Sequence, residues 1–111
     1  MIAQNVLKGL LHYDPETGIF IWNVSRGGAS EWLQAGYIDD RGYRRITVYG
    51  KRYKAAVLAF LYMTGKMPIK RIYHMNKIKH DDRWENLRHG SARYALFSIA
   101  MNHDGKRVNR R

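Results

Sequence analysis

The stretch IYHMNKIKHDDRWENLR, residues 72–88, places a short apolar run directly ahead of a polar loop. Residues 72–75 form a short, mostly apolar run, which favours a short strand. Residues 76–82 are mostly polar, which is typical of a loop. Ser91 precedes a partly apolar run that ends near Asn102, and serine is a preferred first residue of a helix. The stretch therefore predicts a strand, a loop and a final helix, with His74 near the end of the strand.

Upstream of this stretch, residues 55–63 (AAVLAFLYM) predict a buried helix. Alanine and leucine have high helix propensity, and Gly65 suits the left-handed position that ends many helices. Pro68 then interrupts the chain before the next strand.

Residues 1–54 alternate helix, turn and strand signals. Residues 2–11 carry apolar side chains at helical spacing, residues 13–18 form a turn with proline and glycine, and residues 19–22 predict a strand. Residues 25–30 predict a loop, and three further short strands are expected at residues 35–38, 43–48 and 51–54, the last two joined as a hairpin. The complete pattern predicts an α+β fold with a small N-terminal β-sheet region.

Alternation along residues 43–48 divides their side chains between two faces of a strand. One face carries Arg44, Ile46 and Val48, and the other carries Tyr43, Arg45 and Thr47. The second face, together with the basic residues of 51–54, is either a charged surface for a partner or a solvated face, and the sequence leaves both readings open.

A chain of 111 residues is long enough for one compact domain or for two thin subdomains that share a core. We expect a first unit at residues 1–54, a second at residues 55–102 and a basic, mobile tail at residues 103–111.

The charge is distributed unevenly along the chain. The net charge is +11, with two basic against five acidic residues in 1–40 and eighteen basic against four acidic residues in 41–111. Such asymmetry is typical of a protein that binds a polyanion, and it favours nucleic acid as the partner.

Cysteine is absent from the sequence, which excludes a disulfide framework and every cysteine-ligated zinc site. The same absence suits a reducing compartment, and no segment reaches the roughly 18 apolar residues that span a bilayer. We therefore expect a cytoplasmic protein, associated with the nucleoid of a bacterial host cell.

Several stretches, taken together, resemble the phage-encoded HNH endonucleases, a family that includes homing enzymes. The resemblance covers roughly residues 9–102, and each piece is weak alone, but their order and close spacing are specific. The matching pieces are YDPETG at 13–18 with Phe20 and Trp22, AG at 35–36, GY at 42–43, GK at 50–51 with Tyr53, LAF at 58–60, YMTG at 62–65 with Pro68, HMN at 74–76 and DDRWENLR at 81–88.

The resemblance implies a hairpin–helix (ββα-metal) unit and a metal-assisted cleavage of DNA. His74 falls on the position of the family's general base, and Asn86 falls on the asparagine that holds the histidine and its loop in place, between hairpin and helix. The family's metal-binding carboxylate precedes the histidine, where this chain has Tyr73, and its helix ligand lies about nine residues after Asn86, where this chain has Ala95. Neither a neutral phenol nor a methyl group is a useful magnesium ligand, so the resemblance predicts a degenerate active site that holds no metal.

Other departures from the family point the same way. Ala56-Val57 stands where the family has His-Arg, and Asp81-Asp82-Arg83 stands where it has Asp-Asn-Arg. Relocated ligands drawn from the loop around residues 76–82 are the alternative, and only then would Mg²⁺ be a cofactor.

Loss of the metal leaves the basic surface in place. In the family the ββα unit lies along the minor groove of DNA, so the basic residues around His74 and on the upstream sheet are expected to contact mainly phosphates. The predicted contacts with double-stranded DNA are Arg44, Arg45, Lys51, Arg52, Lys54, Lys77, Lys79, Arg83, Arg88 and Arg93. For the aromatic residues Tyr37, Tyr43, Trp84 and Tyr94, core packing is favoured over stacking on bases.

Three functions remain open from the sequence. The first is a DNA-binding protein derived from an HNH endonuclease, without cleavage activity. The second is an active nicking endonuclease with relocated metal ligands, and the third is an inhibitor that uses its basic face on an acidic protein partner. The sequence favours the first.

Overall fold

The structure is a computed structural model that describes residues 2–24 and 33–90. The fold is α+β, as the sequence predicts. Along the chain the elements are α1 (Gln4–Leu10), β1 (Leu11–Asp14), β2 (Ile19–Trp22), β3 (Tyr37–Ile38), β4 (Arg44–Val48), β5 (Lys51–Lys54), α2 (Ala55–Thr64), β6 (Ile72–His74), the 3₁₀ turn η1 (Trp84–Asn86) and β7 (Leu87–His89).

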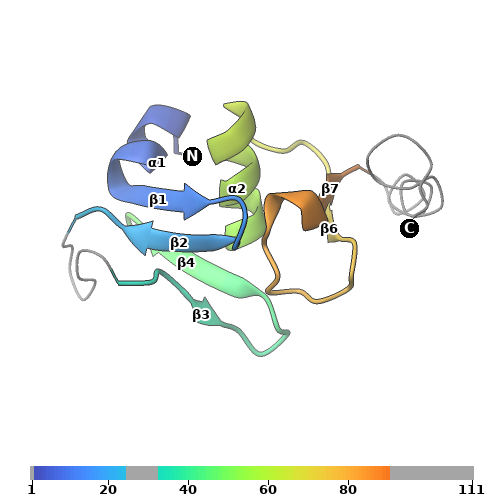
Figure 1. The fold of residues 1–111 in the computed structure, drawn as a ribbon. Coiled ribbons are helices and arrows are strands. Elements are labelled where there is room, and N and C mark those ends of the chain that lie inside the picture. Colours follow the sequence, from blue (N-terminus) through green and yellow to red (C-terminus); the bar gives the residue numbers. More distant parts are fainter. Residues whose placement is uncertain (1, 25–32, 91–111) are drawn as a thin grey trace.

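The strands pair in three small antiparallel sheets. β1 pairs with β2, β4 pairs with both β3 and β5, and β6 pairs with β7. An isolated bridge between Ile21 and Gln34 connects the first sheet to the segment that leads into the second. Figure 1 shows α1 over β1, with α2 standing between α1 and the β6–β7 hairpin.

One apolar core unites the predicted units 1–54 and 55–102. Leu7, Phe20 and Ile46 from the first unit and Leu58 from the second are all fully buried in the same cluster. Helix α2 buries residues on almost every side because it passes through the centre of this core, which explains why its sequence is nearly all apolar. No helix within the described ranges is long and apolar enough to cross a membrane.

Several predicted elements have the expected bounds. β2 and β5 coincide with the predicted strands, and α2 extends the predicted helix by one residue to Thr64. Gly65 ends α2 in the left-handed conformation, with φ +82°, and its amide donates to the carbonyl of Leu61. The predicted division of side chains along β4 is also confirmed, since Ile46 and Val48 are buried whereas Thr47 is exposed.

The prediction that residues 11–14 complete a helix and begin a turn is wrong. These residues form β1, with Leu11 and Tyr13 buried and His12 exposed. Leu11 satisfies both the helical period of α1 and the two-residue period of a strand, so spacing alone assigned it to the helix. The chain therefore passes from α1 into β1 without a connecting residue.

Three other expectations differ from the structure or lie outside it. The strand expected at 35–38 is reduced to β3, and the second strand of the last hairpin, β7, had no local signal of its own. The loop at 25–30, the helix expected at 91–102 and the tail at 103–111 lie outside the described residues.

The turn that follows β1 is docked against the loop that follows β6. The Tyr13 hydroxyl donates to the Asp82 carbonyl at 2.6 Å, and the Trp84 amide donates to the Pro15 carbonyl at 3.0 Å. Gly18 lies so close that a Cβ there would sit 2.4 Å from the Arg83 nitrogen. Burial raises the pKa of the Tyr13 phenol well above its ordinary value, which keeps the donor proton in place.

We predict that Gly18→Ala destabilises the fold more than Gly50→Ala. Both glycines have φ +77°, so both substitutions carry the left-handed strain of about 1–2 kcal/mol. Only at Gly18 would the new methyl group meet backbone atoms, because nothing lies within 4 Å of the corresponding position at Gly50. Urea denaturation of the two variants measures the difference, and equal losses of unfolding free energy would contradict this docking.

Candidate histidine site and nucleic-acid interface

His74 ends β6 with its side chain almost fully enclosed. Its Nε2 lies 2.8 Å from Oδ1 of Asp82, and the two side chains are only 5% and 2% exposed. The other carboxylate oxygen of Asp82 is buried without a hydrogen-bond partner among the described residues. The loop after β6 thus returns a carboxylate to the histidine eight residues earlier.

This contact fixes which nitrogen of His74 is available for chemistry. When the Asp82 carboxylate is ionised, Nε2 carries the proton that is donated to Oδ1. In the neutral ring Nδ1 then holds the lone pair. A carboxylate that orients an imidazole in this way is a common support for a general base. The role of His74 as a base stays a prediction.

Asn86 holds the loop that carries Asp82. Its Oδ1 accepts the amide of Asn76 at 2.9 Å, and its Nδ2 donates to Asn76 Oδ1 at 2.9 Å and to the Asp81 carbonyl at 2.8 Å. The side chain is buried, and these bonds use its donor and acceptor capacity within the loop. This geometry suits the structural role that the sequence predicts for Asn86.

The predicted position of Asn86 between hairpin and helix is wrong. Asn86 lies in η1, ahead of β7, and so belongs to the connection inside the β6–β7 hairpin. β7 has only three residues and begins directly after the turn, so its apolar signal was too short to be recognised.

Tyr73, at the position where the family has a metal-binding carboxylate, lies beside two arginines. It pairs with Arg88 across the hairpin, and the Arg71 guanidinium lies 5.7 Å from the centre of its ring. Within residues 2–24 and 33–90 no group of three or more His, Asp or Glu side chains is arranged to hold a metal ion. Ala95, the second position of interest, lies outside the described residues.

The donor set around His74 does not fit the family's magnesium ion. Magnesium prefers charged oxygen ligands in near-octahedral geometry. The position before the histidine offers a phenol, and the nearest carboxylate, Asp82, is directed at His74 Nε2 with its second oxygen enclosed.

The outer face of β4 and β5 carries the predicted basic surface. In the strand register Arg45 lies opposite Lys54, and Thr47 lies opposite Arg52, so these side chains share one face. Arg52 on β5 donates to the hydroxyl of Tyr37 on β3, across the central strand β4, at 3.1 Å, and Tyr37 is 44% exposed. The expectation that Tyr37 packs in the core is wrong, because β3 lies at the sheet edge with both residues exposed.

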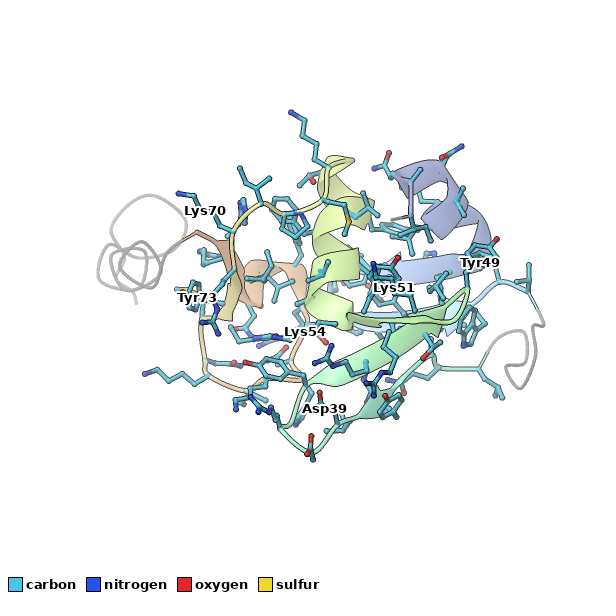
Figure 2. All side chains as sticks on the ribbon, turned by 180° about the vertical axis from the view of Figure 1, so that it is seen from behind. Asp39, Tyr49, Lys51, Lys54, Lys70 and Tyr73 are labelled. Atoms are coloured by element: carbon cyan, nitrogen blue, oxygen red, sulfur yellow. The ribbon has the colours of Figure 1, made fainter. Side chains whose placement is uncertain are left out.

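Tyr43 connects this basic face to the loop beside His74. The Lys54 ammonium lies 4.0 Å from the centre of the Tyr43 ring and the Lys79 ammonium 5.2 Å from it. The ring centres of Tyr43 and His74 are 6.2 Å apart. In Figure 2 the label of Lys54, at the end of β5, lies between those of Tyr73 on β6 and Lys51 at the start of β5. We call the surface formed by Tyr37, Tyr43, Arg45, Arg52, Lys54 and Lys79 the basic face.

Two predicted DNA contacts are engaged by acidic groups of the chain itself. Asp39 accepts from Arg45 at 2.9 Å, and Arg83 is bound to Asp81 through two contacts of 2.8 Å and to Glu85 at 3.1 Å. The hydrogen bond from Arg83 is the main reason that the pKa of Asp81 is lowered to about 2, and Arg45 acts likewise on Asp39. These arginines therefore bring less uncompensated charge to the surface than Lys54 or Lys79.

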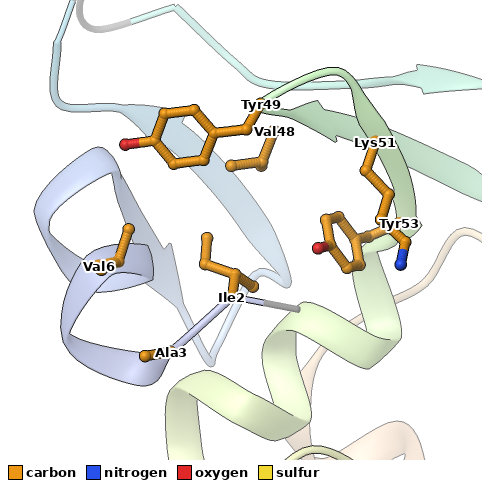
Figure 3. A pocket seen from close by; sticks show the side chains of 7 residues that line it. All are labelled: Ile2, Ala3, Val6, Val48, Tyr49, Lys51 and Tyr53. Atoms are coloured by element: carbon orange, nitrogen blue, oxygen red, sulfur yellow. The ribbon is translucent and has the colours of Figure 1, made fainter.

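The remaining predicted contacts are dispersed. Arg44 is half-buried in β4 and Lys77 is exposed on the loop after β6, while Arg88 donates to the carbonyls of Glu85 and Leu87. Arg93 lies outside the described residues. Lys51 is separate from the histidine site and lines an open hollow between α1 and the β4–β5 turn, which also involves Ile2, Val6, Tyr49 and Tyr53 (Figure 3).

Sequence reasoning named Tyr13, Tyr43 and Asp82 but missed the contacts through which these three residues shape the site. The sequence suggests Asp82 only as a relocated metal ligand. The replacement of the family's asparagine by an acidic residue was the signal that Asp82 could pair with His74. Tyr13 and Tyr43 reach the site from distant parts of the chain, so no local pattern indicated their contacts.

Comparison with known proteins places the similarity in the part of the chain that carries the histidine-bearing hairpin. The HNH endonuclease family profile matches residues 53–96, so this segment of the chain is similar to that family. Among the curated proteins the comparison found no match.

A solved structure of DNA binding and cleavage by the HNH homing endonuclease I-HmuI has a similar fold. The TM-score is 0.59 with 18% sequence identity, over 96% of this chain and 60% of the other. The chain thus spans about 60% of the length of that nuclease. At this identity the likeness establishes the fold, and it supports the α+β architecture around the β6–β7 hairpin.

We predict that Asp82→Ala lowers the free energy of unfolding by about 1–3 kcal/mol, because it leaves the buried Nε2–H of His74 without its acceptor. Asp40→Ala, at an exposed position of the turn before β4, is the matched control and should change stability by less than about 0.5 kcal/mol. Thermal or urea unfolding of the two variants makes the comparison. An Asp82→Ala protein as stable as the control would show that the pair contributes nothing to the fold.

Proposed function

We propose that this protein binds double-stranded DNA through the basic face and the loop after β6, and that it does not cleave the DNA. The observation that carries the binding proposal is the continuity of positive charge from β5 to that loop. The Lys54 and Lys79 ammonium groups both lie close to the Tyr43 ring, whose centre is 6.2 Å from that of the His74 ring. Clustered cations on one face are the electrostatic footprint of a phosphate backbone.

The proposal of no cleavage rests on the chemistry of the side chains at the two metal positions. HNH chemistry needs a divalent ion to stabilise the charge that develops on the phosphate and on the leaving oxygen. Tyr73 offers a neutral phenol, and Ala95 has no donor atom. A histidine base alone does not replace that electrophile, so cleavage should fall to background.

The active-nuclease alternative has one specific observation in its favour. The buried Asp82–His74 pair keeps an imidazole in the tautomer and orientation that a general base requires. A protein that has lost cleavage need not retain this geometry, except where it also stabilises the loop. We therefore treat metal-dependent nicking as the second candidate function.

Binding to DNA should depend on salt in a way that identifies the basic face. We predict that Lys54→Gln makes the negative slope of log K against log salt concentration shallower by about 0.9, the effect of one lost phosphate contact. Lys66→Gln removes the same charge just beyond the other end of the 10-residue helix α2, about 15 Å away along the helix, and should leave the slope nearly unchanged. Titrations of a labelled duplex at several salt concentrations measure both slopes. Equal slopes in the two variants would argue against this face, and absence of duplex binding at low salt would argue for a protein partner.

Cleavage is tested by restoring the family's ligands. We expect no EDTA-sensitive nicking of supercoiled plasmid by the wild-type protein, whereas Tyr73→Asp combined with Ala95→Asn should bind Mg²⁺ or Mn²⁺ in calorimetry and regain measurable nicking. The same double substitution in a His74→Ala background should bind the ion without nicking. Wild-type nicking that disappears with EDTA would establish the alternative function.

A further inference from the structure

An isoleucine is exposed in the middle of the most basic loop of the site. Ile78 lies between Lys77 and Lys79, four residues after His74, and is 46% exposed. Every residue from 76 to 80 is exposed, and Ile78 is the apolar member of that group. A branched aliphatic side chain in this position adds nothing to attraction for phosphate.

The backbone around Ile78 is held in place rather than loosely extended. The Ile78 amide donates to Asn76 Oδ1 at 2.9 Å, and its carbonyl accepts the Asp81 amide at 3.1 Å. Lys77 adopts a left-handed conformation with φ +65°, which orders the turn that presents the isoleucine. Asn76 is itself bound by the buried Asn86. The loop therefore presents an apolar side chain from an ordered support.

The same loop is anchored at the edge of the basic face. The Lys79 ammonium donates to the Arg41 carbonyl at 3.1 Å and lies over the ring of Tyr43. Ile78 is thus adjacent in sequence to a cation that is fixed beside the surface proposed to follow the DNA backbone. A duplex brought to that surface would meet the isoleucine next to the phosphate contacts.

Proteins that bind the minor groove often insert an apolar side chain between base pairs, partly unstacking a base step. Isoleucine has the size and polarity for this role, and an ordered loop lowers the entropy lost on insertion. We infer that Ile78 is an apolar wedge that enters a base-pair step of bound duplex DNA and unwinds it locally. This inference rests on the proposed DNA binding and adds a deformation of the duplex to it.

The test measures unwinding without knowledge of the DNA sequence that is bound. Relaxed closed-circular plasmid is saturated with protein in EDTA, treated with a topoisomerase that needs no metal, and deproteinised, and its linking number is read on a gel. We expect the wild-type protein to lower the linking number in proportion to the amount bound. Ile78→Ala should lose most of this shift at equal saturation, while its affinity changes by less than about tenfold, because the cost of unstacking offsets the burial of the side chain.

Ile69→Ala is the matched control, since Ile69 is 87% exposed in the segment between α2 and β6 and should leave the shift unchanged. Both variants should unfold at the wild-type temperature. A lower unfolding temperature for Ile78→Ala would overturn the inference, because the side chain would then be part of the fold.

The outcomes separate the inference from the function on which it rests. A wild-type protein that fails to bind duplex DNA removes the proposed function. A protein that binds without changing the linking number, or whose shift survives Ile78→Ala, leaves DNA binding intact and removes the wedge.

Discussion

The hydrogen bond from the Tyr13 hydroxyl to the Asp82 carbonyl ties the first hairpin to the loop on which the site is built. Both groups are buried, and together with the close packing of Gly18 against Asp82 and Arg83 they fix the position of that loop. If the loop moved, the Asp82 carboxylate would no longer meet His74, and the Asn86 network would lose its geometry. An unmade hydrogen bond at a buried site is costly, so the arrangement favours a single loop conformation.

The site combines an imidazole that is held by a buried carboxylate with a set of donor atoms that does not suit a magnesium ion. His74, Asp82 and Asn86 form a closed set of polar contacts inside the β6–β7 connection. Tyr73, on the same strand as His74, presents an aromatic ring beside Arg71. These features are compatible because the loop contacts stabilise the fold whether or not an ion is bound. In this interpretation the main role of His74 is to stabilise the loop through its contact with Asp82.

The basic residues differ in how much uncompensated positive charge they present to a partner. Arg45 and Arg83 are engaged by Asp39 and Asp81, whereas among residues 2–24 and 33–90 the partners of Lys54 and Lys79 are a tyrosine ring and a backbone carbonyl, both uncharged. The lysines therefore dominate long-range attraction, and the arginines mainly order the turns from which they project. A count of basic residues overstates the charge available to DNA for this reason.

The sequence by itself determined the α+β class, the bounds of β2 and β5, the start of α2, the alternation of side chains along β4 and the resemblance to HNH endonucleases, since these depend on local periodicity, on residue type and on the order of short motifs. It also singled out His74 and Asn86, and it predicts that Tyr73 and Ala95 do not bind magnesium. The tertiary structure alone decided that Leu11–Asp14 is a strand, that Asp82 pairs with His74, and that Tyr43 joins the basic face to the loop. These contacts bring together residues from different hairpins, or from the two ends of one loop, and their formation depends on burial in a shared core that local patterns do not encode.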